Sequence, residues 1–116
     1  MGTSSEDFVE LVHQLDGVAQ NDGARYSTFR THGHPFGYLW PATETVGLKQ
    51  LVAEQLALVS ERPEVFEVQF TAGGFGWVVV HLGGVDRVEL AELTYEAWRL
   101  TAPAEVVAAR ADRLPT

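Results

Sequence analysis

The chain has 116 residues, enough for one domain with a hydrophobic core that needs no metal or disulfide bond to fold. It contains no cysteine, which excludes disulfide frameworks, thiolate nucleophiles and cysteine-ligated zinc or iron–sulfur centres. Sixteen acidic residues against eight basic residues give a formal net charge of −8, which repels polyphosphates at long range, so nucleic-acid binding requires a local basic patch.

An amphipathic helix is the first element that the sequence predicts. Apolar residues at positions 8, 11, 12, 15 and 19 repeat with the spacing of one helical face, and residues 3–6 (Thr-Ser-Ser-Glu) have the form of a capping box. Gly17 weakens this helix, and the Gln-Asn-Asp-Gly cluster at residues 20–23 ends it. The helix is therefore expected to run from the capping box to about residue 19.

Three strands in a meander are predicted after the first helix. Residues 24–32 (ARYSTFRTH) and 35–40 (PFGYLW) are rich in aromatic and β-preferring residues, and the intervening His-Gly-His-Pro is a turn signal. Pro41 and the turn after it separate the second strand from a short third strand near residues 46–49. The three segments are therefore expected to belong to one sheet.

A second helix and two further strands follow. After the third strand the spacing of apolar side chains becomes helical, with Val52, Leu56 and Val59 on one face. Residues 66–70 alternate between apolar and polar side chains, as in a strand with one wet face. Residues 77–82 are mostly apolar on both faces, which is typical of a strand in the middle of a sheet.

The third helix has the clearest start. Asp86 and Glu89 form a capping box, Pro103 marks the end of the helix, and residues 104–114 are expected to form a short C-terminal helix. The element order is then α-β(3)-α-β(2)-α with this short helix appended. Such an order indicates an α+β fold with two layers, in which helices pack against an antiparallel five-stranded sheet.

The chain is expected to form a single domain covering residues 1–116, with loose tails at residues 1–3 and 114–116. The N-terminus has no basic region, and no stretch approaches the roughly 20 apolar residues of a membrane span. We therefore expect a soluble, cytoplasmic protein that has no membrane partner.

Residues 71–82 read TAGGFGWVVVHL, and this glycine run has two interpretations, a phosphate loop or a turn. Phosphate loops lead from a strand into the start of a helix, where free N–H groups and the helix dipole face the anion. Here the glycines lie between two predicted strands, and no Lys or Arg occurs from Pro63 to Asp86. A hairpin turn is the better interpretation, because Gly73 and Gly74 can take the positive φ angles that tight turns require.

No catalytic or metal-binding constellation stands out. His32 and His34 are two residues apart, but a metal site needs a third ligand, whose position the spacing does not give, so a polar turn is favoured. Glu89, Glu92 and Glu96 share one helix face, where a solvated surface is favoured over acid–base chemistry. The sequence therefore predicts no catalytic residue, no metal and no cofactor.

Two segments resemble one known family. FTAGGFGWVVVHL and VDRVELAELTYEAWRLTAP are similar to the C-terminal half of the MmcQ/YjbR family of small bacterial proteins, and the similarity runs from the first helix to about Pro103. The resemblance implies the order α-β(3)-α-β(2)-α, close to the folds of type III secretion chaperones and of CyaY-like proteins. It also implies a DNA-binding role, because the paired hairpins suggest a double-wing shape.

The functional prediction is a small non-enzymatic binding module. Since the second hairpin carries no Lys or Arg, DNA contacts are expected at Arg25, Arg30 and Lys49, in the region of the first hairpin. The alternative is a protein-interaction module, monomeric or homodimeric, that uses an exposed sheet face with Trp40 and Phe75, two aromatic residues at strand ends or turns. A small-ligand or metal-dependent enzyme is the third class, and no geometry in the spacing supports it.

Overall fold

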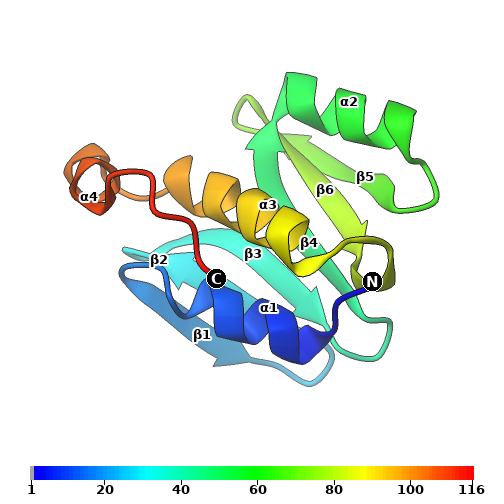
Figure 1. The fold of residues 1–116 in the computed structure, drawn as a ribbon, viewed down its shortest axis with the longest axis horizontal. Helices are drawn as coiled ribbons and strands as arrows, with labels where there is room; N and C mark the ends of the chain where they lie inside the picture. The colour runs from blue at the N-terminus through cyan, green and yellow to red at the C-terminus, as the bar shows by residue number, and fades with distance from the viewer. Residues whose placement is uncertain (1) are drawn as a thin grey trace.

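The computed structural model describes residues 2–116 as four α-helices and one six-stranded antiparallel sheet (Figure 1). In chain order the elements are α1 (Ser5–Val12), β1 (Val18–Asp22), β2 (Ser27–Thr31), β3 (His34–Trp40), β4 (Thr45–Leu51), α2 (Val52–Glu61), β5 (Phe66–Ala72), β6 (Phe75–His81), the 3₁₀ turn η1 (Leu82–Gly84), α3 (Arg87–Arg99) and α4 (Ala104–Arg110). The strand order is β1-β2-β3-β4-β6-β5. The predicted α+β class and antiparallel sheet are therefore confirmed. None of the helices in residues 2–116 has both the length and the apolar character needed to cross a bilayer.

The sheet has six strands, so the prediction of five was wrong. Helix α1 ends at Val12, and Val18–Asp22 form strand β1, which pairs with β2 at one edge of the sheet. Gly17, in the turn between them, takes a φ of 72°, a left-handed conformation that glycine adopts without strain. Backbone pairing with β2 thus outweighs the helical spacing of Ala19, whose side chain is exposed.

Helices α1, α2 and α3 lie on one face of the sheet, over the hydrophobic core (Figure 1). The ring of Phe8 in α1 packs edge-on against Phe29 of β2, with the ring centroids 5.2 Å apart. The side chain of Gln50 in β4 donates to the backbone oxygen of Leu93 in α3 over 3.1 Å. Within residues 2–116, no helix packs on the opposite face, which is called the open face below.

Helix α2 covers the β5–β6 end of the helix-covered face, but not with the side chains that were predicted. Gln55 is the residue of α2 that is buried, at 2% exposure, whereas Leu56 is 59% exposed. A Cβ atom at Gly76 of β6 would lie 2.7 Å from the Cβ of Gln55, so glycine permits the close approach of α2 to the sheet. The predicted apolar face is correct only in part, because Val59 packs at the rim of the core.

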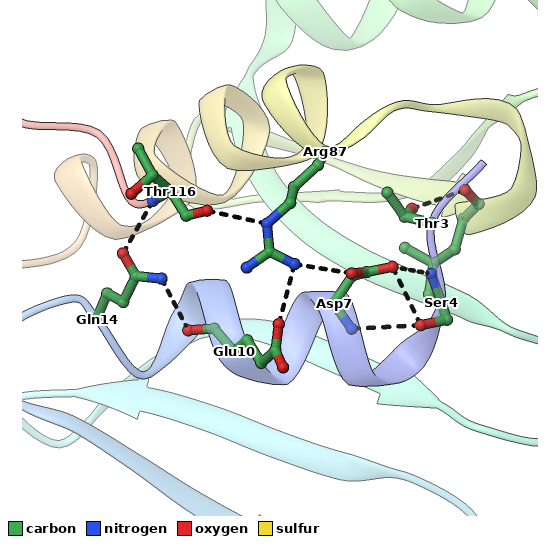
Figure 2. A network of polar contacts seen from close by, with 8 residues as sticks. Thr3, Ser4, Asp7, Glu10, Gln14, Arg87 and Thr116 are labelled. Atoms are coloured by element: carbon green, nitrogen blue, oxygen red, sulfur yellow. Dashed lines mark hydrogen bonds and ion pairs between the residues drawn. The ribbon is translucent and has the colours of Figure 1, made fainter. Parts of the chain in front are cut away.

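Arg87, the first residue of α3, connects helix α1 to the C-terminus (Figure 2). Its guanidinium donates to Asp7 over 2.7 Å and to Glu10 over 3.0 Å, and its Nε donates to the backbone oxygen of Thr116 over 2.9 Å. Asp7 also completes the capping box of α1, in which Ser4 is the N-cap, one residue later than predicted. Thr116, in a segment expected to be a loose tail, is thus bound to the body of the domain.

Asp7→Asn is expected to destabilise the protein at neutral pH, by an amount that shrinks in acid. The backbone N–H of Ser4 donates to the Asp7 carboxylate over 2.9 Å and lowers the pKa of Asp7 below its ordinary value of 3.8. Burial raises this pKa, whereas the Ser4 hydroxyl and Arg87 lower it further. A carboxyl group with a depressed folded-state pKa contributes stability above the unfolded value and loses it as pH falls through the folded pKa. Urea unfolding at about pH 7, 4 and 3 measures this, and a difference that stays constant over this range contradicts the assignment.

Candidate functional site on the open sheet face

Five aromatic rings form a continuous row across the open face, called the aromatic row below. In spatial order they are Tyr26, Trp40, Tyr38, Trp77 and Phe70. They come from the loop before β2 and from strands β3, β6 and β5. Successive ring centroids are 5.8, 6.0, 5.4 and 5.2 Å apart, so the rings touch and make one apolar surface.

Strand alternation and one glycine place the rings of β3 on this face. Tyr38 and Trp40 flank Leu39, which is 3% exposed on the helix-covered face, so both rings point the other way. The row then crosses β4 at Gly47, which is opposite Tyr38 in the register of the sheet. The amide of Gln69 occupies the space over Gly47 where a larger residue would have its side chain.

Phe70 joins the aromatic row because strand β5 contains a bulge. The register with β6 shifts between Val68 and Phe70, so that Val68 pairs with Val78 while Phe70 pairs with Trp77. The expectation of one half-buried alternating face in β5 was therefore wrong beyond Phe66, which is fully buried. Val68 is 52% exposed because β5 is an edge strand, and Phe70 is turned to the open face.

The two ends of the aromatic row are its most accessible parts. Tyr26 is 45% exposed and Phe70 is 39% exposed, whereas Trp77 in the row is 6% exposed. A hollow of about 280 Å³ lies between the ends, lined by Tyr26, Tyr38, Trp40, Gln69 and Phe70. The side-chain oxygen of Gln69 is buried over Gly47 of β4 and has no hydrogen-bond partner within residues 2–116.

Three basic side chains lie on or beside the open face, and none of them forms an ion pair within residues 2–116. Arg25 lines a second hollow at the β1–β2 loop. Arg30 of β2 donates to the amide oxygen of Asn21 over 3.0 Å. Lys49 of β4 holds its Nζ 4.1 Å from the ring centroid of Phe75, and burial lowers the pKa of Lys49.

Basic side chains elsewhere are mostly neutralised by carboxylates. Four arginines form such ion pairs: Arg62, Arg87, Arg99 and Arg110. Glu67 of β5 is the acidic residue that the strands place on the open face, where its carboxylate contacts His81. The strands thus place Arg30, Lys49 and Glu67 on the open face, with Arg25 in the loop beside it, in a chain whose net charge is −8.

The structure gathers on this face the residues that the sequence assigned to two alternative functions. Arg25, Arg30 and Lys49 were predicted to contact DNA, and Trp40 and Phe75 were predicted to contact a partner. Strand order and register bring Arg30, Trp40, Lys49 and Phe75 to the same side of the sheet, and Arg25 lies beside it in the β1–β2 loop. The assignment of these residues to either role stays a prediction.

Four rings of the aromatic row were missed as site residues: Tyr26, Tyr38, Phe70 and Trp77. The alternation of Tyr38 and Trp40 within a predicted strand was an available signal, since a period of two places both side chains on one face. The sequence assigned Trp77 to the core. Its side chain is buried, but it packs against the rings of Tyr38 and Phe70 on the open face. Phe70 gave no signal, because the bulge that redirects it leaves no local pattern in the sequence.

Motifs outside the open face have structural explanations. His32 and Gly33, with φ angles of 51° and 85°, form the β2–β3 turn, and the His32 ring contacts the Thr31 hydroxyl over 2.9 Å. Among residues 2–116 there is no group of three side chains able to hold a metal ion. Gly73 and Gly74, with φ angles of 60° and 83°, connect β5 to β6, which confirms the predicted hairpin turn.

The carboxylates of α3 line a cleft between α2 and α3. Glu89, Glu92 and Glu96 all contribute to it. Glu89 pairs with Arg62, and Glu96 pairs with Arg99 through two hydrogen bonds of 2.7 and 2.8 Å. The pairing of two of the three carboxylates agrees with a solvated helix face.

Comparison with known proteins bears on the fold and the family. A family model described as YjbR matches residues 13–100. Among solved structures, the chain is similar to protein DR2400 of Deinococcus radiodurans, a protein with a DUF419 domain: the TM-score is 0.74 at 16% sequence identity, covering 86% of this chain and 81% of that chain. At this identity the similarity shows the fold alone. No curated protein sequence matches the chain.

Proposed function

The chain belongs to the YjbR family, and from that premise we propose that it is a non-enzymatic module that binds nucleic acid through the open face of its sheet. One observation carries the proposal: basic side chains without ion pairs and the aromatic row share a face. Lys and Arg bind phosphates, and bases stack on aromatic rings. The groups on this face are therefore suited to binding rather than to reaction.

The charge distribution restricts where a polyanion can bind. Most acidic residues lie on the helices and turns, where the arginines are paired, so the helix-covered side repels nucleic acid. Charges separated by more than about 10 Å are largely screened at 0.1 M salt, so short-range contacts on the open face decide the affinity. Binding is therefore expected to be modest and to weaken steeply as salt rises.

The triple variant Arg25→Gln, Arg30→Gln, Lys49→Gln is expected to lose most of the affinity for nucleic acid. Each phosphate contact contributes roughly 0.7 to 0.9 to the slope of log affinity against log salt, so removing three contacts should lower that slope by about 2 to 3. Fluorescence anisotropy of labelled oligonucleotides, single-stranded and duplex, measures affinity and slope in a salt titration from about 20 mM.

A second triple variant provides the matched control. Arg62→Gln, Arg99→Gln, Arg113→Gln removes the same charge from positions outside the open face, and it is expected to bind as the wild type does. Equal weakening by both triples would show that only net charge matters. Failure of the wild type to bind either form of oligonucleotide at about 20 mM salt would reject the proposed function.

A protein partner on the same face is the second candidate function. The observation in its favour is that Trp, Tyr and Arg, the residue types that dominate the energetics of protein interfaces, are concentrated here. If the partner is a second copy of the chain, sedimentation equilibrium should show a dimer that dissociates in Trp40→Ala. A monomer at all concentrations for the wild type counts against a homodimer.

A further inference from the structure

We infer that the nucleic acid bound on the open face is a single strand with unstacked bases, and not a duplex held between two hairpin wings. The inference rests on the proposed function and specifies its ligand. Three features of the structure carry it: the position of the unpaired cations, the width of the face, and the arrangement of the aromatic row.

The cations are not at the hairpin tips, where a double-wing contact with a duplex requires them. The tips are the β2–β3 turn at His32 and Gly33 and the β5–β6 turn at Gly73 and Gly74. The chain has no Lys or Arg from residue 63 to residue 86, so the second tip offers nothing to a phosphate backbone. Arg25, Arg30 and Lys49 lie instead in the β1–β2 loop and within β2 and β4.

The open face is also too broad to enter a groove of DNA. The major groove admits an α-helix or a two-stranded ribbon. Here the aromatic row extends from the loop before β2 to the edge strand β5, in a sheet of six strands about 4.8 Å apart. A flexible single strand can lie along such a surface, whereas a duplex touches it only with its outer phosphates.

The aromatic row presents surfaces that only an unstacked base can use. In a duplex the faces of the bases are covered by their neighbours, so aromatic side chains reach them in single strands. Tyr26 and Phe70 are the exposed ends of the row and both line the hollow between them, so their rings are accessible to a base. Arg25 precedes one end of the row in sequence, and Lys49 lies in β4, which the row crosses.

The decisive measurement compares one sequence of about 12 nucleotides as a labelled single strand and as a blunt duplex, by fluorescence anisotropy at low salt. We expect the single strand to bind the wild type at least about tenfold more tightly. The double variant Tyr26→Ala, Phe70→Ala should lose about tenfold or more of that affinity. Tyr26→Phe, which retains the ring, should bind as the wild type does.

Val88→Ala is the control for removing exposed apolar surface, since Val88 is 69% exposed on α3; it should leave binding unchanged. Duplex affinity equal to or above single-strand affinity overturns the inference and leaves the proposed function standing. If the folded double variant Tyr26→Ala, Phe70→Ala binds the single strand as tightly as the wild type does, the inference is overturned and the proposed function still stands. Absence of binding to both forms overturns the inference together with the proposed function.

Discussion

Trp98→Ala is expected to lower the free energy of unfolding by about 4 kcal/mol, because it removes the largest fully buried side chain of the core. The indole of Trp98 is 0% exposed, lies 5.7 Å from the ring of Tyr95, and donates its N–H to the backbone oxygen of Asp16 over 2.8 Å. The substitution therefore leaves a cavity and removes a buried hydrogen bond. Domains of this size have total stabilities of about 5 to 15 kcal/mol, so the loss is a large fraction of the whole.

Trp98→Phe separates the two contributions. The phenyl ring fills most of the space, so this variant loses mainly the hydrogen bond to Asp16, worth about 1 to 2 kcal/mol. The Asp16 oxygen keeps a second donor, the Thr31 hydroxyl at 3.0 Å, which limits the penalty. Urea unfolding of the two variants and the wild type measures the difference, and an equal loss in both would show that the hydrogen bond, and not the cavity, dominates.

The helix that carries Trp98 is the part of the fold that the sequence predicted best, because its signals are local. The Asp86 side chain accepts from the backbone N–H of Glu89 over 2.8 Å, as expected of an N-cap. β1 was missed for the opposite reason: its residues form a strand only because they pair with β2, and Ala19 continues the helical spacing of α1. Helix α3 was thus predictable from local chemistry, whereas β1 was not, because only its pairing with β2 makes it a strand.

The candidate site shows the same division. Residue type alone identified Arg25, Arg30 and Lys49 as the basic residues available to an anion, and it identified Trp40 as an aromatic residue of uncertain burial. The strand order, with β4 inserted between β3 and β6, and the register place Arg30, Lys49 and Trp40 on one face. Phe70 belongs to the site only because of the bulge in β5. Residue type thus identified some of the basic and aromatic residues of the candidate site. That they share one face depends on the pairing register of strands that are far apart in the sequence.

Gln55→Leu is expected to lower the free energy of unfolding by about 2 to 3 kcal/mol, although it replaces a buried polar side chain by an apolar one of similar size. The Gln55 amide, 2% exposed in α2, donates to the backbone oxygens of Phe70 over 3.2 Å and Trp77 over 2.9 Å. These oxygens lie beside the bulge that interrupts the β5–β6 ladder. Leucine cannot donate, so the substitution removes a donor from two backbone acceptors, at least one of them in a buried bond.

The same residue links stability to the proposed binding surface, because Phe70 and Trp77 are two rings of the aromatic row. Gln55 lies on the helix-covered face and cannot touch a ligand on the open face, so any effect on affinity must pass through the β5–β6 backbone. Gln55→Leu should therefore accelerate amide exchange in β5 and weaken oligonucleotide binding together. Leu56→Ala, at an exposed neighbouring position, should change stability by less than about 0.5 kcal/mol. If Gln55→Leu proves as stable as the wild type, the amide does not hold the bulge, and the orientation of Phe70 must come from packing of the rings alone.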